Sequence, residues 1–243
     1  MVGRVTAYMG GETFSNPMEL KITENNFRIN EYSIEGVEEE SMIFNGISEE
    51  LIILSHATKE YLIISKQEMT ELMNQIAMVK EELKAQMEMM SPEEKAYMEQ
   101  IMAQQGISMN DIPKTSYSPS GKKEQVLGRS CQHYEGRTED VLVTEVWVSS
   151  FKSLGISEKE INGLILFSKY MKEIAEGFQA MSDDDFSFLL HEDYQGIPLK
   201  ERSYEGGQLT SEMVVVEVSV EKISDDEFRA PASYSMMDFN EGN

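Results

Sequence analysis

Side chains that form cross-links or bind metals are scarce in this sequence of 243 residues. It has one cysteine, Cys131, so no intrachain disulfide can form, and cysteine usage does not indicate a cellular compartment. The three histidines, His56, His133 and His191, are far apart, and none stands three or four residues from another as in helical zinc motifs. The sequence therefore predicts no cofactor and no metal site.

Positive charge is also scarce. The chain has 21 Lys and Arg residues against 44 Asp and Glu residues, a formal net charge of -23. Such a chain repels phosphate backbones and anionic lipid headgroups at long range. No apolar run approaches the roughly 18 residues that a membrane-spanning helix needs. We expect no nucleic-acid partner and no transmembrane segment.

The common catalytic motifs are missing as well. The stretch GRSCQ at 128–132 is not a nucleophile elbow, because Gln132 stands where that motif requires glycine. The stretch SGKK at 120–123 is not a phosphate loop, because Lys123 occupies the position of the magnesium-binding Ser or Thr. The acidic run at 183–185 lacks the alternating spacing of a calcium loop and is typical of a solvated charge cluster. We predict that the protein is not an enzyme.

Short alternating stretches dominate the first 65 residues. They predict an antiparallel meander with turns at 45–46 and 56–59, and its clearest strands are MELKIT, NFRINEYSI, SMIF, ELIIL and YLIIS. Strands return at Cys131–Gly136 and Val141–Ser149, and a further hairpin turns at Gly206-Gly207. In its last strand, alternation predicts one shared face for Val214, Val216, Val218 and Val220.

Two segments change to helical spacing. From Met69 onward, apolar residues recur every three or four positions, and a second helix begins at Ser91, whose capping box with Glu94 precedes a C-terminal Gly106. These predict a helical hairpin over about 66–106. A capping box at Ser157 opens a third helix over about 157–181. Residues 107–123 are rich in Ser, Pro and Lys without periodicity and predict a long surface loop.

These elements together predict one domain over residues 1–243 of the α+β class. Its expected architecture is a curved antiparallel sheet or incomplete β-barrel covered by about three amphipathic helices. A sheet interrupted by amphipathic helical insertions is what such a covered sheet requires.

Methionine is abundant, with 18 residues, many of them on the predicted helices. Flexible, polarisable thioethers fill cores as leucine does, but they also form apolar surfaces that adapt to irregular ligands or partners. A soft-metal role for MEMM at 87–90 is a third interpretation, although no histidine is near it in sequence. The pattern alone leaves these three interpretations open.

Several stretches in this order resemble a family: SMIFNG, ELIILSHATKEYLIIS, VLGRSCQHYEG, TEVWVSS, GIPLK and ISDDEFRAPASY. Most of the likeness comes from Gly128 and Cys131, Trp147, the G-x-P at 196–198 and the F-x-x-P-x-x-Y at 228–234. Over about residues 26–239, the chain resembles bacterial secreted proteins of a domain family of unknown function. That family is similar to the LolA/LppX-type lipoprotein-carrier superfamily, whose fold is an incomplete antiparallel barrel with helices over its mouth.

The resemblance implies a non-catalytic, extracytoplasmic binding protein for a lipid, an acyl chain or a lipoprotein-like group, with any signal peptide removed. The ligand would lie between the sheet and one apolar side of the helices, against Met69, Leu72, Met73, Ile76, Leu83, Met87, Met98, Met102, Leu164, Met171 and Phe178. The alternative is a protein-interaction module with a solid core, whose Met-rich hairpin docks an envelope partner. In either case we expect Cys131 and Trp147 to be core residues of the sheet.

Overall fold

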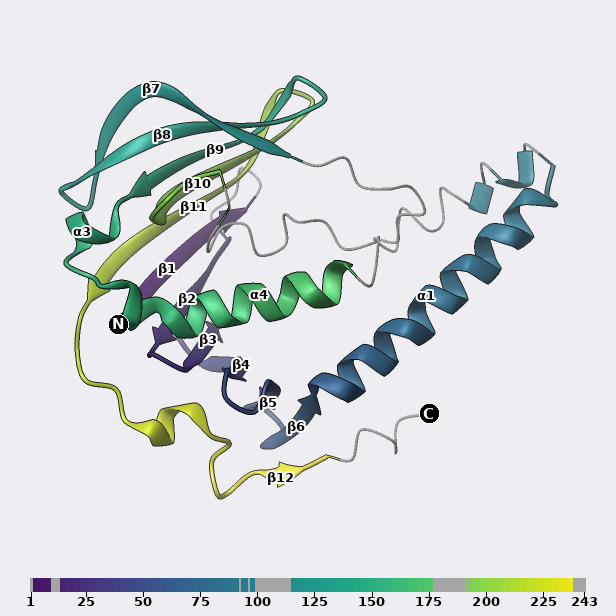
Figure 1. Ribbon diagram of the computed structural model, residues 1–243, viewed down its shortest axis with the longest axis horizontal. Coiled ribbons are helices and arrows are strands. Elements are labelled where there is room, and N and C mark those ends of the chain that lie inside the picture. Colours follow the sequence, from purple (N-terminus) through teal and green to yellow (C-terminus); the bar gives the residue numbers. More distant parts are fainter. Residues whose placement is uncertain are drawn as a thin grey trace.

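The structure is a computed structural model that describes residues 2–9, 14–91, 93–95, 97–98, 115–176, 191 and 193–237. Its described strands form one sheet in the order β12-β6-β5-β4-β3-β2-β1-β11-β10-β9-β8-β7. The sheet curls around helix α4 without closing into a barrel (Figure 1). The predicted α+β fold class, a curved antiparallel sheet with helices, is confirmed.

The first half of the sheet is the expected meander. Its strands are β1 (Val2–Met9), β2 (Phe14–Ile22), β3 (Asn26–Tyr32), β4 (Glu38–Asn45), β5 (Glu50–Ser55) and β6 (Glu60–Ser65). Each pairs antiparallel with the next, and the β4–β5 and β5–β6 turns fall where Asn45-Gly46 and residues 56–59 predicted them.

The second half consists of β7 (Ser116–Val126), β8 (Arg129–Thr138), β9 (Val141–Ser149), β10 (Ile197–Glu205) and β11 (Gln208–Ser219). The two halves are joined at the seam between β1 and β11, which pair antiparallel over the whole length of β1. At the edge of the sheet furthest from β7, the short β12 (Ser235–Met236) pairs parallel with β6.

Strand β7 corrects the predicted loop over 107–123, because residues 116–123 belong to a strand. This strand lies at the edge of the sheet, where β8 provides its hydrogen bonds and no apolar alternation is needed. Its pairing is interrupted by a register shift between Pro119 and Lys123, which accommodates the proline. Residues 107–114 lie outside the described part of the chain.

The helices begin near their predicted positions. Helix α1 (Lys66–Glu88) starts after Ser65, whose side chain forms a capping box with Glu68. The Ser91–Glu94 box is also formed, with the Ser91 amide donating to the Glu94 carboxylate at 2.9 Å. The predicted third helix divides into a 3-10 turn, η1 (Glu158–Ile161), and α4 (Asn162–Glu176). Residue 106 and residues 177–181 lie outside the described part of the chain.

Helix α4 lies inside the curve of the sheet, whereas α1 leads away from it (Figure 1). The ring of Phe167 on α4 stacks on Phe27 of β3 at a centroid distance of 4.7 Å and an interplanar angle of 17°. Phe167 also meets Phe44 of β4 at 5.5 Å. Helix α4 therefore covers the apolar face of β2 to β4, while α1 contacts mainly β6 and α4.

The valines of β11 do not share one face as predicted. Arg4 of β1 pairs with Glu217 and Val5 pairs with Val215, so Val216 is a bulged residue without a partner on β1. A bulge shifts the side-chain alternation by one residue. Val215 is consequently buried and Val218 packs against the core, while Val216 and Val220 are about half exposed.

Candidate functional site

The best-packed part of the predicted site is the apolar layer between α4 and the sheet. Leu164 is buried there, and Met171 is half-buried against the same cluster of side chains. Met69, from the first turn of α1, joins this cluster. The structure therefore brings together Met69, Leu164 and Met171, three of the predicted ligand-contacting residues.

The other predicted residues follow α1 away from this layer. Met87 is buried near the end of α1, and the side chains of Leu72, Leu83 and Met98 are half-buried but belong to none of the packed apolar clusters. Met73 and Ile76 lie on α1, but their side chains are not described. Met102 and Phe178 lie outside the described residues. The α1 stripe, defined here as Met69, Leu72, Leu83 and Met87, thus extends beyond the core.

The junction of α1 and α4 is fixed by charge. Lys66, the first residue of α1, donates to Glu49 in the β4–β5 turn at 3.0 Å and to Glu173 on α4 at 2.9 Å. Hydrogen bonding to Glu173 raises the pKa of Lys66, and the same contact lowers the pKa of Glu173. These ion pairs are exposed, so they orient α1 more than they stabilise the fold.

Beneath this junction is a buried phenol. Tyr170 of α4 is 2% exposed, and its ring meets Phe44 at 5.0 Å. Within the described part of the chain its hydroxyl has no hydrogen-bond partner. Burial raises the pKa of Tyr170 to about 12, so the group stays a neutral donor near pH 7. A buried unpartnered hydroxyl is uncommon, and it marks a place where a polar atom would be accommodated.

Several apolar side chains on and after α1 are exposed. Met78 and Val79 on α1, Met89 just after it and Tyr97 beyond are all more than 60% exposed. Helical spacing places Met78 on the side of α1 opposite Leu72 and Leu83, whereas Val79 lies on the same side as those two leucines. The helix therefore presents apolar groups on more than one side.

Cys131 and Trp147 are core residues, as expected. Cys131 is fully buried, and burial raises the pKa of its thiol. Trp147 is 5% exposed and is flanked by Lys200, whose Nζ lies 4.6 Å from the ring centroid, and by Arg202. These cation–π contacts fasten β10 to β9.

We predict that Cys131→Ala lowers the free energy of unfolding by about 1 kcal/mol, because a small buried side chain is truncated. The native thiol should react only slowly with a maleimide at neutral pH, since the thiolate is disfavoured by burial. Mass spectrometry of native and urea-unfolded protein measures this difference. Rapid stoichiometric labelling of the native protein would contradict the prediction.

A hydrogen-bonded chain of side chains from β7 to β10 resembles a catalytic arrangement. Nδ1 of His133 is hydrogen-bonded to Ser120 Oγ at 2.6 Å, and Nε2 is hydrogen-bonded to the Glu145 carboxylate at 3.1 Å. The Tyr204 hydroxyl donates to the second oxygen of Glu145. The His133 side chain is only 3% exposed, and both of its ring nitrogens are engaged. Such a chain satisfies a buried histidine, as buried polar groups require.

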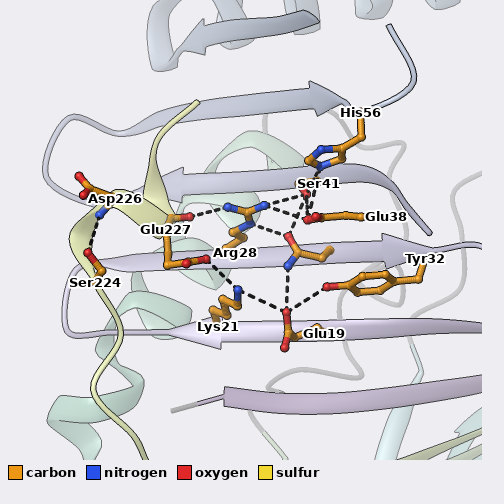
Figure 2. Close-up of polar contacts among 11 residues, drawn as sticks. Glu19, Lys21, Arg28, Tyr32, Glu38, Ser41, His56, Ser224, Asp226 and Glu227 are labelled. Atoms are coloured by element: carbon orange, nitrogen blue, oxygen red, sulfur yellow. Dashed lines mark hydrogen bonds and ion pairs between the residues drawn. The ribbon is translucent and has the colours of Figure 1, made fainter. Parts of the chain in front are cut away.

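A second polar network lies on the face of β2 to β4 opposite α4 (Figure 2). Arg28 of β3 is its centre. Its guanidinium donates to Asn30 at 2.5 Å, to Glu38 at 2.9 Å and to the main-chain carbonyl of Glu227 at 2.6 Å. The network therefore joins the sheet to the C-terminal segment, defined here as residues 220–237.

The C-terminal segment is held at several further points. Lys21 donates to the Glu227 carboxylate at 2.8 Å, and the Tyr234 hydroxyl lies 2.7 Å from Nδ1 of His56. Phe228, in the 3-10 turn η2 (Asp225–Phe228), packs on Ile43 and Leu54. The F-x-x-P-x-x-Y stretch thus forms a strap across the sheet.

Glu19 completes the network. Burial alone would raise the pKa of its carboxyl, but Lys21 beside it and hydrogen bonds from Asn30 and Tyr32 hold the pKa below its usual value. Sequence reasoning missed this network. Its signal is that Arg28 and Asn30 occupy alternate positions in a strand whose other face carries Phe27 and Ile29, so polar groups line one face.

The described residues contain neither a cluster of metal ligands nor a membrane-spanning helix. No group of three or more His, Cys, Asp or Glu side chains among them is arranged to hold a metal ion. None of the helices there combines the length and hydrophobicity that crossing a bilayer demands.

Residues 64–234 match the family model described as a domain of unknown function (DUF4412). The chain belongs to the DUF4412 family. The resemblance to a domain family of unknown function is thereby confirmed. The DUF4412 match includes α1, α4, Cys131, Trp147 and most of the C-terminal segment, and it leaves β1 to β5 outside. A search of curated proteins found no match.

Among solved structures, an uncharacterized conserved protein from Thermus thermophilus is 9% identical, with a TM-score of 0.48 and coverage of 97% of this DUF4412 chain and 88% of its own. The Pseudomonas aeruginosa MucA/MucB complex gives 10% identity, a TM-score of 0.43 and coverage of 97% and 57%. For PNGF-II the values are 10%, 0.41, 98% and 31%. Identities and TM-scores this low transfer no function.

Proposed function

We propose that this protein is a non-catalytic, extracytoplasmic binding protein for a hydrophobic ligand such as a lipid, an acyl chain or a lipoprotein-like group. One observation supports it above the others: the α1 stripe continues past the packed core, and within the described part of the chain Leu72 and Leu83 are half-buried and belong to no apolar cluster. Apolar surface outside a packed core is a common feature of ligand and partner sites. The extracytoplasmic location rests on the family resemblance.

The absence of catalysis is part of the proposal. The thiol of Cys131 is buried, and burial raises its pKa. A nucleophilic cysteine requires the opposite, a lowered pKa. In the Ser120–His133–Glu145 chain, a substrate would have to displace a hydrogen bond from a histidine that is almost fully buried. These features support a structural role for both groups.

A protein-interaction module is the second candidate. It is favoured by exposed apolar side chains away from the α1 stripe: Met78 on the outer side of α1, opposite Leu72 and Leu83, and Met89 just after the helix. In that case the occupant is an envelope protein that contacts the outer side of α1, and the α1 stripe contributes nothing to binding.

The two candidates predict different results for paired variants. With Leu72→Gln and Leu83→Gln combined, we expect the affinity for an uncharged apolar dye such as N-phenyl-1-naphthylamine to fall about tenfold, the equivalent of about 1.4 kcal/mol. The α1 stripe is weakened, while the fold loses little because neither side chain is in a packed cluster. Fluorescence titration measures the affinity.

Met78→Gln is the matched control, because it makes the same kind of change on the opposite side of α1 and should leave dye binding unchanged. Native mass spectrometry of protein purified from its own host adds an independent observation. No dye binding by the wild type, together with an unliganded mass and a co-purifying protein, would support the interaction module instead.

A further inference from the structure

We infer that the hydrophobic ligand carries an uncharged hydrogen-bond acceptor, such as the carbonyl of an acyl ester, and that the hydroxyl of Tyr170 donates to it. This inference rests on the proposed function and names the chemical class of its ligand. Three observations support it: the unpartnered phenol, its position at the base of the α1 stripe, and the charge around that position.

The first observation is the state of the hydroxyl. Tyr170 is 2% exposed, and its oxygen is among the buried side-chain atoms without a hydrogen-bond partner in the described part of the chain. The ring itself is fully used, since it packs on Phe44 at 5.0 Å and belongs to the main apolar cluster. A phenylalanine would fill the same space without leaving a donor unpaired. The hydroxyl therefore adds nothing to packing and is a donor without an acceptor in the described part of the chain.

The second observation is where the hydroxyl lies. Tyr170 precedes Glu173 by one helical turn, and Glu173 pairs with Lys66 at the start of α1. The ring of Tyr170 meets Phe44 near the end of β4, just before the turn that carries Glu49, so the phenol lies near the α1–α4 junction. Met69, the first residue of the α1 stripe, belongs to the same cluster as Tyr170. An acyl chain along the stripe would thus end beside this hydroxyl.

The third observation concerns charge. Lys66 and Lys169 are both cations at the junction. Glu49 and Glu173 accept hydrogen bonds from the Lys66 ammonium group, and Lys169 Nζ lies 3.7 Å from the Glu173 carboxylate. Both lysines are therefore already paired with carboxylates, which disfavours the carboxylate of a free fatty acid there. The net charge of -23 adds long-range repulsion of any anionic headgroup. A neutral acceptor such as an ester carbonyl avoids both penalties and still pairs with the phenol.

The test compares two lipids of equal acyl length, monolauroylglycerol and laurate, as competitors of N-phenyl-1-naphthylamine. We expect wild-type protein to bind the ester at least about tenfold more tightly than laurate, and Tyr170→Phe to lose about tenfold in affinity for the ester. The variant should melt no lower than wild type, because an unpaired buried donor has been removed. Tyr134→Phe is the control, since it removes a half-buried tyrosine hydroxyl from a different apolar cluster.

The outcomes separate this inference from the proposed function. If the wild type binds neither dye nor lipid, the binding function fails and this inference fails with it. If the wild type binds both lipids equally, or Tyr170→Phe keeps its full affinity for the ester, only the inference is overturned. Should the variant fold poorly, wild-type protein labelled with carbon-13 at the tyrosine Cζ atoms decides: monolauroylglycerol must shift the Tyr170 signal, and an unchanged signal refutes the inference.

Discussion

Phe167→Ala should lower the free energy of unfolding by about 3 to 5 kcal/mol, the largest effect we expect from a single apolar truncation in this chain. Phe167 is fully buried. It stacks on Phe27 at 4.7 Å and meets Phe44 at 5.5 Å, so it connects α4 to two strands at once. Its removal leaves a cavity that the rigid sheet cannot close.

Urea unfolding followed by tryptophan fluorescence measures this loss, because Trp147 is buried in the folded protein. Ile165→Ala is the matched control on the same helix, since Ile165 is 39% exposed and its truncation should cost less than about 1 kcal/mol. Equal effects of the two substitutions would contradict the packing of α4 described above.

Arg28→Met should lower the free energy of unfolding by about 3 to 5 kcal/mol, the typical cost of removing one partner from a buried ion pair. The Arg28 side chain is 9% exposed and pairs with Glu38. Methionine keeps the unbranched stem of the side chain, but it leaves the Glu38 carboxylate, Asn30 Oδ1 and the Glu227 carbonyl without this donor. The loss is therefore electrostatic rather than steric.

The same variant should release the C-terminal segment before the whole domain unfolds. Limited proteolysis should cleave Arg28→Met within residues 220–237 at least about tenfold faster than the wild type, because the guanidinium ties this segment to β3. Arg229→Met is the control, since Arg229 is 71% exposed and its ion-pair partner among the described residues, Asp226, is 86% exposed. Matching cleavage rates in the two variants would refute the role of Arg28.

Local patterns in the sequence were enough to locate most elements. Helix starts could be predicted because a capping box is a contact between residues three apart, as Ser91 and Glu94 show. The turn at Gly206-Gly207 could be predicted because glycine accommodates the positive φ angles that both residues adopt. The turn at Asn45-Gly46 could be predicted because an asparagine side chain bonds the backbone just after it, as Asn45 Oδ1 does with the Ile47 amide. The burial of Cys131 could be predicted because the residue begins a strand in which the base closest in sequence, His133, lies two residues further on.

Features decided by distant partners could not be predicted. Strand β7 has no alternating pattern, and only its pairing with β8 makes it a strand. The exposure of Val216 depends on a bulge set by the register of β11 against β1, which lies at the other end of the chain. A period-two pattern carries no information about such an interruption.

Some features of the candidate site could be predicted from local patterns and others could not. The α1 stripe was visible as a helical repeat, and the structure unites its first residue, Met69, with Leu164 and Met171. The unpartnered hydroxyl of Tyr170 could not be predicted from the sequence. It can be recognised only once α4 is packed and the described residues around it provide no hydrogen-bond partner. The Arg28 network was missed for a related reason, since its partners come from segments as far apart as Glu38 and Glu227.

The seam between β1 and β11 sets the order in which this chain can fold. The strands β1 to β6 and β7 to β9 pair with neighbours in sequence, so they can form early, but β1 has no partner on its other side until β11 has been synthesised. Closing a loop of this length is slow, and an apolar strand waiting with an open edge is prone to aggregation. During synthesis, the first half of the sheet therefore remains incomplete until β11 has left the ribosome.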